Sequence, residues 1–147
     1  MRTFVPTTLS TLLLLATLPD ASPGQRPDPG TEAYRADTAA PPFVVRRVGR
    51  GRPMILIPGL ASSGEVWDAT AARYRERYEL HVLTLAGFAG VPPVAADPFL
   101  RRQRDAILQY IRDHRLERPV LVGHSLGAFL AFWVAATAPE AVGPVVA

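Results

Sequence analysis

The sequence predicts an α/β fold with a mostly parallel sheet and flanking helices, and three observations lead to this class. Short runs of apolar residues alternate along the chain with longer segments of helical character. The apolar runs are continuous, as expected for strands that are buried on both faces. A serine flanked by glycines follows directly after one of these runs. Such alternation places parallel strands in the centre and helices on both faces.

The individual elements begin at residue 43. The predicted strands are Phe43–Val48, Met54–Ile57, Leu80–Leu85 and Pro119–Val122, with the start of another at Val145–Ala147. The predicted helices are Glu65–Tyr78, Phe99–His114 and Ser125–Thr137. The second of these helices has an amphipathic pattern, whereas the third is nearly all apolar and is therefore expected to be buried.

Composition excludes several classes of protein. The chain has 147 residues, 48% of them hydrophobic, which fits one domain and excludes a wholly disordered protein. It has no cysteine, so a disulfide framework, a thiolate metal site and a cysteine nucleophile are excluded. All of the basic residues are arginines, spread along the chain among acids. A nucleic-acid partner is therefore not expected, and neither a cofactor nor a metal is predicted.

The first residues resemble an export signal. No charge lies between Arg2 and Asp20, and the apolar run Leu9–Leu18 is short for a membrane span. We predict a signal peptide over residues 1–21, with an uncleaved membrane anchor or an unstructured terminus as alternatives. The protein is thus expected to be exported, periplasmic or secreted, and to touch a membrane only through this segment. Residues 22–42 are rich in proline and glycine and predict a flexible linker before the folded part, residues 43–147.

The informative motif is Gly123-His-Ser-Leu-Gly127, which matches G-x-S-x-G between a predicted strand and a predicted helix. In that context Ser125 would sit on a sharp, strained turn, and side chains at positions 123 and 127 would collide. The N-terminus of the following helix favours a developing negative charge. Ser125 is therefore the candidate nucleophile, with an incidental glycine turn as the alternative.

An acyl-transfer site also needs two hydrogen-bond donors for the oxyanion. The first candidate is the backbone N–H of Leu126, directly after the serine. The second is the N–H of Leu60, in the loop Pro58-Gly-Leu-Ala-Ser-Ser-Gly64 after a predicted strand. An ordinary strand-to-helix loop is the alternative for this segment.

Three segments together resemble the α/β-hydrolase family: Ile55–Trp67, Leu83–Gly90 and Val122–Gly127. The resemblance implies the N-terminal part of that fold over residues 43–147, truncated after the nucleophile helix. It also implies a serine hydrolase that acts on an ester or related small-molecule acyl substrate through an acyl-enzyme. The family usually has histidine before the oxyanion-loop glycine, where this chain has Pro58.

The chain departs from the family pattern after the serine. Members of the family place an acid and then a histidine after the nucleophile, but here only Glu140 follows and no histidine does. His81, His114 and His124 all precede Ser125, and none is predicted to be the base. His81 is predicted in the core, His114 at a helix end and His124 lining or packing beside the site. We expect very little turnover; a non-catalytic binding protein or a truncated relic is the alternative.

Two further expectations concern the surroundings of the site. Phe88 lies in the loop after a predicted strand, where it could line an acyl pocket or serve only in packing. An uncovered strand edge and a partly uncovered apolar helix predict non-specific self-association.

Overall fold

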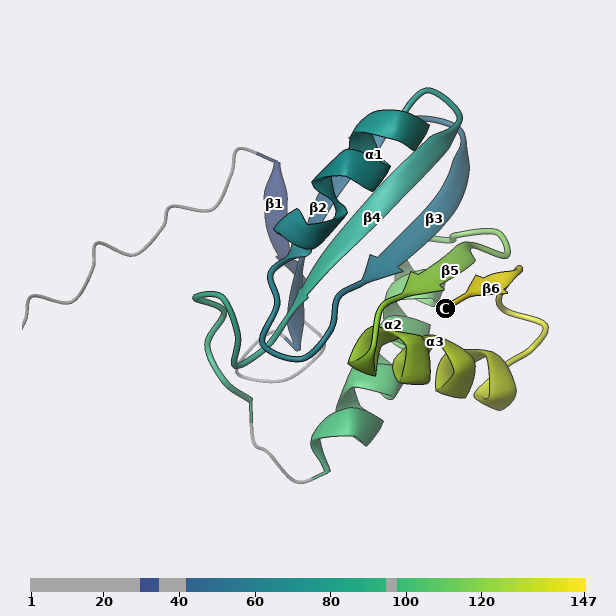
Figure 1. The fold of residues 1–147 in the computed structure, drawn as a ribbon. Coiled ribbons are helices and arrows are strands. Elements are labelled where there is room, and N and C mark those ends of the chain that lie inside the picture. Colours follow the sequence, from purple (N-terminus) through teal and green to yellow (C-terminus); the bar gives the residue numbers. More distant parts are fainter. Residues whose placement is uncertain (1–29, 35–41, 95–97) are drawn as a thin grey trace, which may run out of the picture.

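The computed structural model describes residues 30–34, 42–94 and 98–147, which form one six-stranded sheet with helices on both faces (Figure 1). The strands are β1 (Thr31–Tyr34), β2 (Phe43–Gly49), β3 (Arg52–Ile57), β4 (Tyr78–Leu85), β5 (Val120–Gly123) and β6 (Val145–Val146). The helices are the 3-10 helix η1 (Gly64–Trp67), α1 (Asp68–Tyr74), α2 (Phe99–Asp113) and α3 (Leu126–Thr137).

Strand β3 lies inside the sheet, whose order is β1-β2-β4-β3-β5-β6. It pairs in parallel with both β4 and β5, and β5 pairs in parallel with β6. At the other edge, β2 runs antiparallel to β4, and β1 runs antiparallel to β2. The predicted fold class, a mostly parallel sheet with flanking helices, is confirmed.

Alternating side chains of the central strands supply two separate cores. Met54, Leu56, Leu80 and Val82 pack with Ala71 of α1 on one face. The intervening residues Ile55, Ile57, Leu83 and Leu85 pack with α2 and α3 on the other. Because successive strand residues point to opposite faces, a continuous apolar run is what a two-sided strand requires.

The predicted helix Glu65–Tyr78 is wrong at its C-terminal end and interrupted at its start. The Ser63 hydroxyl accepts a hydrogen bond from the Glu65 N–H and begins a 3-10 turn, not an α-helix. Helix α1 then ends at Tyr74, whose carbonyl accepts from the Arg77 N–H at 2.9 Å. This turn redirects the chain into β4, which starts at Tyr78.

The predicted flexible linker, residues 22–42, is wrong for residues 31–34, which form strand β1. No proline lies in this stretch, and its backbone pairs with β2. Tyr34 is buried, stacks on Phe43 with ring centroids 5.2 Å apart, and donates a hydrogen bond to Asp113.

The predicted signal segment, residues 1–21, lies outside the described residues. None of the helices in the described part of the chain has the length and hydropathy of a membrane span.

Helix α3 is only half buried: its nearly all-apolar composition predicted a buried helix, whereas the expectation of a partly uncovered apolar helix agrees with the structure. Its inner stripe of Gly127, Leu130, Ala131 and Val134 packs on the sheet. Phe129 and Phe132 on the outer side are 52% and 57% exposed. An apolar helix that packs on one face leaves its other apolar residues in solvent. The expected self-association stays a prediction that this exposed surface motivates.

His81 of β4 is a fully buried histidine that joins the sheet to α2. Its Nδ1 lies 2.7 Å from the Tyr110 hydroxyl, while Nε2 has no hydrogen-bond partner among the described residues and lies 3.8 Å from Glu79. Burial lowers the pKa of His81 from 6.5 to about 4, with the Glu79 carboxylate acting in the opposite direction. The core position predicted for this histidine is confirmed, and one of its two ring nitrogens is hydrogen-bonded there.

This histidine predicts a pH dependence of stability. The pKa is lower in the folded state, so the unfolded chain binds more protons between pH 6.5 and about 4. The free energy of unfolding should therefore fall as the pH falls through this window, by on the order of 3 kcal/mol. Denaturant unfolding at pH 7.5, 6, 5 and 4.5 measures the slope.

The matched variants are His81→Gln, which cannot titrate, and His114→Gln, which changes an exposed imidazole. Glu79 and Asp113 have pKa values below their ordinary 4.5 and 3.8, so their effect on stability begins only below about pH 5 and overlaps the lower end of this window. The slope between pH 7.5 and 5 therefore reports His81. His81→Gln should flatten the slope and His114→Gln should keep it. An unchanged slope in His81→Gln would contradict the assignment.

Candidate active site

Ser125 occupies the turn between β5 and α3 with φ 53° and ψ −115°. This left-handed φ is strained for any residue with a side chain. The turn is held by backbone hydrogen bonds: the His124 N–H donates to the Ile57 carbonyl at 3.1 Å, and the Ser125 carbonyl accepts from the Ala128 N–H at 3.0 Å. Ser125 thus stands exposed at the carboxyl end of a parallel strand.

The two glycines of the motif are places where no side chain fits. A Cβ on Gly123 would lie 2.3 Å from the Gly127 carbonyl oxygen. A Cβ on Gly127 would lie 2.1 Å from the Ile57 carbonyl oxygen, at the end of the neighbouring strand β3. The spacing in the sequence therefore reflects one close approach, in which α3 begins directly against β3.

The loop after β3 lies beside the serine. A Cβ on Gly59 would be 3.0 Å from His124 Nδ1 and 3.4 Å from Ser125 Cβ. Leu60 follows on a turn in which the Ser62 N–H donates to the Gly59 carbonyl at 3.3 Å. Leu126 is the first residue of α3, and N–H groups of a first turn have no carbonyl partner within their helix. The structure thus brings the loop that carries Leu60 next to the start of α3.

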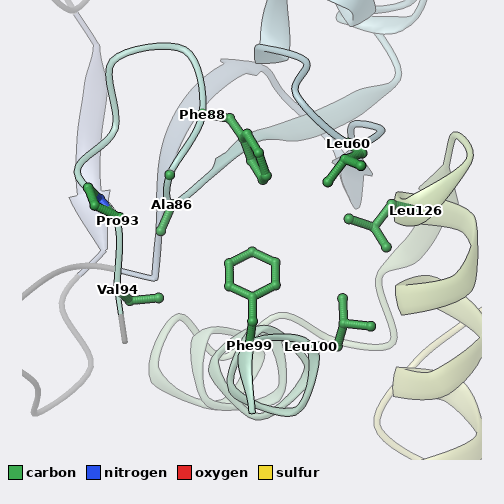
Figure 2. Close-up of a pocket in the computed structure, with 9 residues that line it drawn as sticks. Leu60, Ala86, Phe88, Pro93, Val94, Phe99, Leu100 and Leu126 are labelled. Atoms are coloured by element: carbon green, nitrogen blue, oxygen red, sulfur yellow. The ribbon is translucent and has the colours of Figure 1, made fainter. Parts of the chain in front are cut away.

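A pocket of about 390 Å³ lies where these two segments meet the loop after β4 (Figure 2). The residues that line it are Leu60, Ala86, Gly87, Phe88, Pro93, Val94, Phe99, Leu100 and Leu126. Phe88 therefore lies where an acyl-pocket residue was predicted. His124 is not among the lining residues, and its exposed imidazole lies beside Gly59 instead. Phe99 and Leu100 were not predicted, because their sequence pattern indicates only the start of a helix.

The described residues supply no partner for the Ser125 hydroxyl. His81 is bonded to Tyr110 in the core. His114 lies at the end of α2, with Nδ1 3.1 Å from the Tyr110 carbonyl. Glu140 is exposed after α3. Among residues 30–34, 42–94 and 98–147, no cluster of three or more histidines and carboxylates is placed to hold a metal ion.

Comparison with known proteins identifies the family. A model described as the alpha/beta hydrolase family matches residues 54–147, well over half of the chain. The chain belongs to the α/β-hydrolase family. This confirms the resemblance carried by the serine turn and the two loops beside it.

Three relatives illustrate the match. A pimeloyl-[acyl-carrier protein] methyl ester esterase of Aeromonas salmonicida is 31% identical over 100 residues, which are 65% of this chain and 37% of that protein. An (E)-2-((N-methylformamido)methylene)succinate hydrolase of Acinetobacter baylyi is 29% identical over 64% of this chain and 36% of its own length. A solved marine microorganism esterase shares the fold, with a TM-score of 0.62 and 24% identity over 70% of this chain and 40% of that one. The chain thus spans little more than a third of the length of the curated relatives.

The close approach at Gly127 predicts a large loss of stability on substitution. Gly127→Ala would place a methyl group against backbone that cannot move aside, and should cost at least about 3 kcal/mol. Gly90→Ala is the control, because Gly90 has φ +81° but open space around its Cβ position. It should cost only about 1–2 kcal/mol of backbone strain. Equal losses in urea unfolding would contradict the steric account.

Proposed function

We propose that the chain carries the nucleophile and oxyanion-binding half of a serine hydrolase active site of the α/β-hydrolase type. Its substrate is an ester or a related small-molecule acyl compound, and Ser125 is the residue acylated. The observation that carries this proposal is the strained backbone of Ser125 at the start of α3, beside the loop of Gly59 and Leu60. The relatives described as an esterase and a hydrolase support the same class of reaction.

The chemistry follows from the positions of the groups. The Ser125 oxygen attacks the acyl carbon, and the carbonyl oxygen takes up the negative charge. The N–H groups of Leu60 and Leu126 are the proposed donors to that oxygen, aided by the positive end of the α3 dipole. Expulsion of the alcohol or amine, which takes up the proton given up by the Ser125 hydroxyl, leaves the acyl-enzyme. Water then hydrolyses it to the free acid and Ser125. The pocket beside Leu60 and Leu126 would hold the acyl group.

Serine is a weak nucleophile without a base. The printed sequence has no histidine after Ser125, and the three before it lie in other environments. We therefore propose that the acid and the base belong to a part of the fold outside these 147 residues.

The second candidate function is non-catalytic binding of a small molecule, which the pocket combined with the unpartnered serine favours. Export through the N-terminal segment remains part of the proposal.

A fluorophosphonate probe tests the assignment of Ser125. The purified chain should form a single adduct at Ser125, at a rate at least about a thousandfold below that of a complete serine hydrolase, because no base removes the hydroxyl proton. Intact mass followed by peptide mapping locates the adduct.

The matched variants are Ser125→Ala, which should abolish the adduct, and Ser62→Ala in the neighbouring loop, which should keep it. Rapid turnover of a p-nitrophenyl ester that depends on Ser125 would show that the base has been misassigned. A folded chain with no adduct at Ser125 would favour the binding protein over the hydrolase.

A further inference from the structure

The pocket beside Ser125 is lined by apolar residues. None of the nine described residues that line it carries a charged or hydrogen-bonding side chain. One wall is formed by Leu60 and Leu126, the residues whose N–H groups are the proposed oxyanion donors. The pocket therefore lies next to the two segments that carry the proposed oxyanion donors, and the described residues that line it offer only apolar contacts.

The arginines that follow Phe99 and Leu100 in the sequence do not add a positive charge to the lining of the pocket. Arg101 and Arg102 at the start of α2 are exposed. The guanidinium of Arg104 lies 4.7 Å from the centre of the Trp133 ring on α3 and is hydrogen-bonded to Asp105. None of these three is among the residues that line the pocket. A ligand carboxylate placed in the pocket would therefore lose water without gaining a cationic partner among the described residues that line it.

Two phenylalanine rings that line the pocket contact each other. Figure 2 shows Phe88, from the loop after β4, facing Phe99, the first residue of α2. Their ring centroids are 6.3 Å apart and their planes are nearly perpendicular, at 88°. Edge-to-face pairs of this kind are favourable, which limits the movement of both rings.

The loop that carries Phe88 is itself fixed. The Gly87 N–H donates to the Val91 carbonyl at 3.0 Å, and the Val91 N–H donates to the Phe88 carbonyl at 2.9 Å. Val91 is buried, and the Ala86 N–H is bonded to the Pro42 carbonyl at 2.9 Å. The Phe88 ring is thus held in position before any ligand arrives, as a selectivity element should be.

We propose that this pocket selects an uncharged, apolar acyl group, and that Phe88 and Phe99 are the residues that set this selectivity. The proposal rests on the proposed function, because it assigns the pocket to the acyl part of the substrate of Ser125. An acyl chain that ends in a methyl group packs against the two rings. The same chain ending in a carboxylate is rejected.

Binding to the Ser125→Ala variant of the whole chain tests this without any chemistry at the serine. The two probes are methyl heptanoate and monomethyl adipate, which share a methyl ester head and the next four methylene groups. They differ in their far end, which is an ethyl group in one and a carboxylate of similar length in the other. Methyl-group NMR shifts of Leu60 and Leu126 report occupancy of the pocket. Methyl heptanoate should bind at least about a hundredfold more tightly than monomethyl adipate, because the unpaired carboxylate must be desolvated.

Substitutions then identify the determinants. Phe99→Ala in the Ser125→Ala background should weaken methyl heptanoate binding at least about tenfold, because the ring contacts are lost. The control is Phe132→Ala, which removes a phenylalanine on the exposed side of α3, outside the pocket. If Phe99→Ala does not fold, Phe88→Ala provides the same test at a loop position whose backbone hydrogen bonds stay intact.

Equal affinity for the two probes, or equal losses in Phe99→Ala and Phe132→Ala, would overturn the proposal. Absence of any shift in Leu60 and Leu126 would overturn it as well. Failure here is separable from failure of the proposed function, because fluorophosphonate labelling of Ser125 does not need this selectivity. Selective binding without labelling would leave the pocket assignment standing and remove the serine mechanism.

Discussion

The contact between the start of α3 and the end of β3 is the constraint on which the site depends. A Cβ on Gly127 would lie 2.1 Å from the Ile57 carbonyl oxygen, so the helix backbone touches the strand backbone directly. Strand β5 lies beside β3, and the chain must pass from the end of β5 to the start of α3 within a few residues. That short path places Ser125 at φ 53°. The same contact brings the loop after β3 against the serine, and with it Leu60, which forms one wall of the pocket with Leu126.

Much of the fold is readable from the sequence where a local pattern determines it. The runs at residues 54–57 and 80–85 predict buried strands because both faces of β3 and β4 are covered by helices. The sequence does not reveal the strand order, the break at the end of α1 or strand β1. These depend on contacts between distant segments, such as Tyr34 with Phe43 and with Asp113, which no local pattern encodes.

The residues of the candidate site also fall into two groups, those that a local sequence pattern predicts and those that depend on contacts between distant segments. The G-x-S-x-G spacing specifies the serine turn and its glycines because the steric requirement is local. Phe88 is predicted from its position after a strand. Phe99 and Leu100 enter the pocket only because α2 is fixed against the sheet and α3, in part through the bond between Tyr110 and His81. Their role is a tertiary property, and a helical sequence pattern cannot reveal it.

The most direct test of this account is the strain at Ser125, since it requires neither activity nor a base. The measurement is the free energy of unfolding of Ser125→Gly relative to Ser125→Ala, with Ala136→Gly on the exposed part of α3 as the reference for the intrinsic effect of glycine. If the backbone forces a left-handed φ, Ser125→Gly should be more stable than Ser125→Ala by about 1 kcal/mol, while Ala136→Gly loses a similar amount. A Ser125→Gly variant less stable than Ser125→Ala would show that the turn is unstrained and would contradict the account.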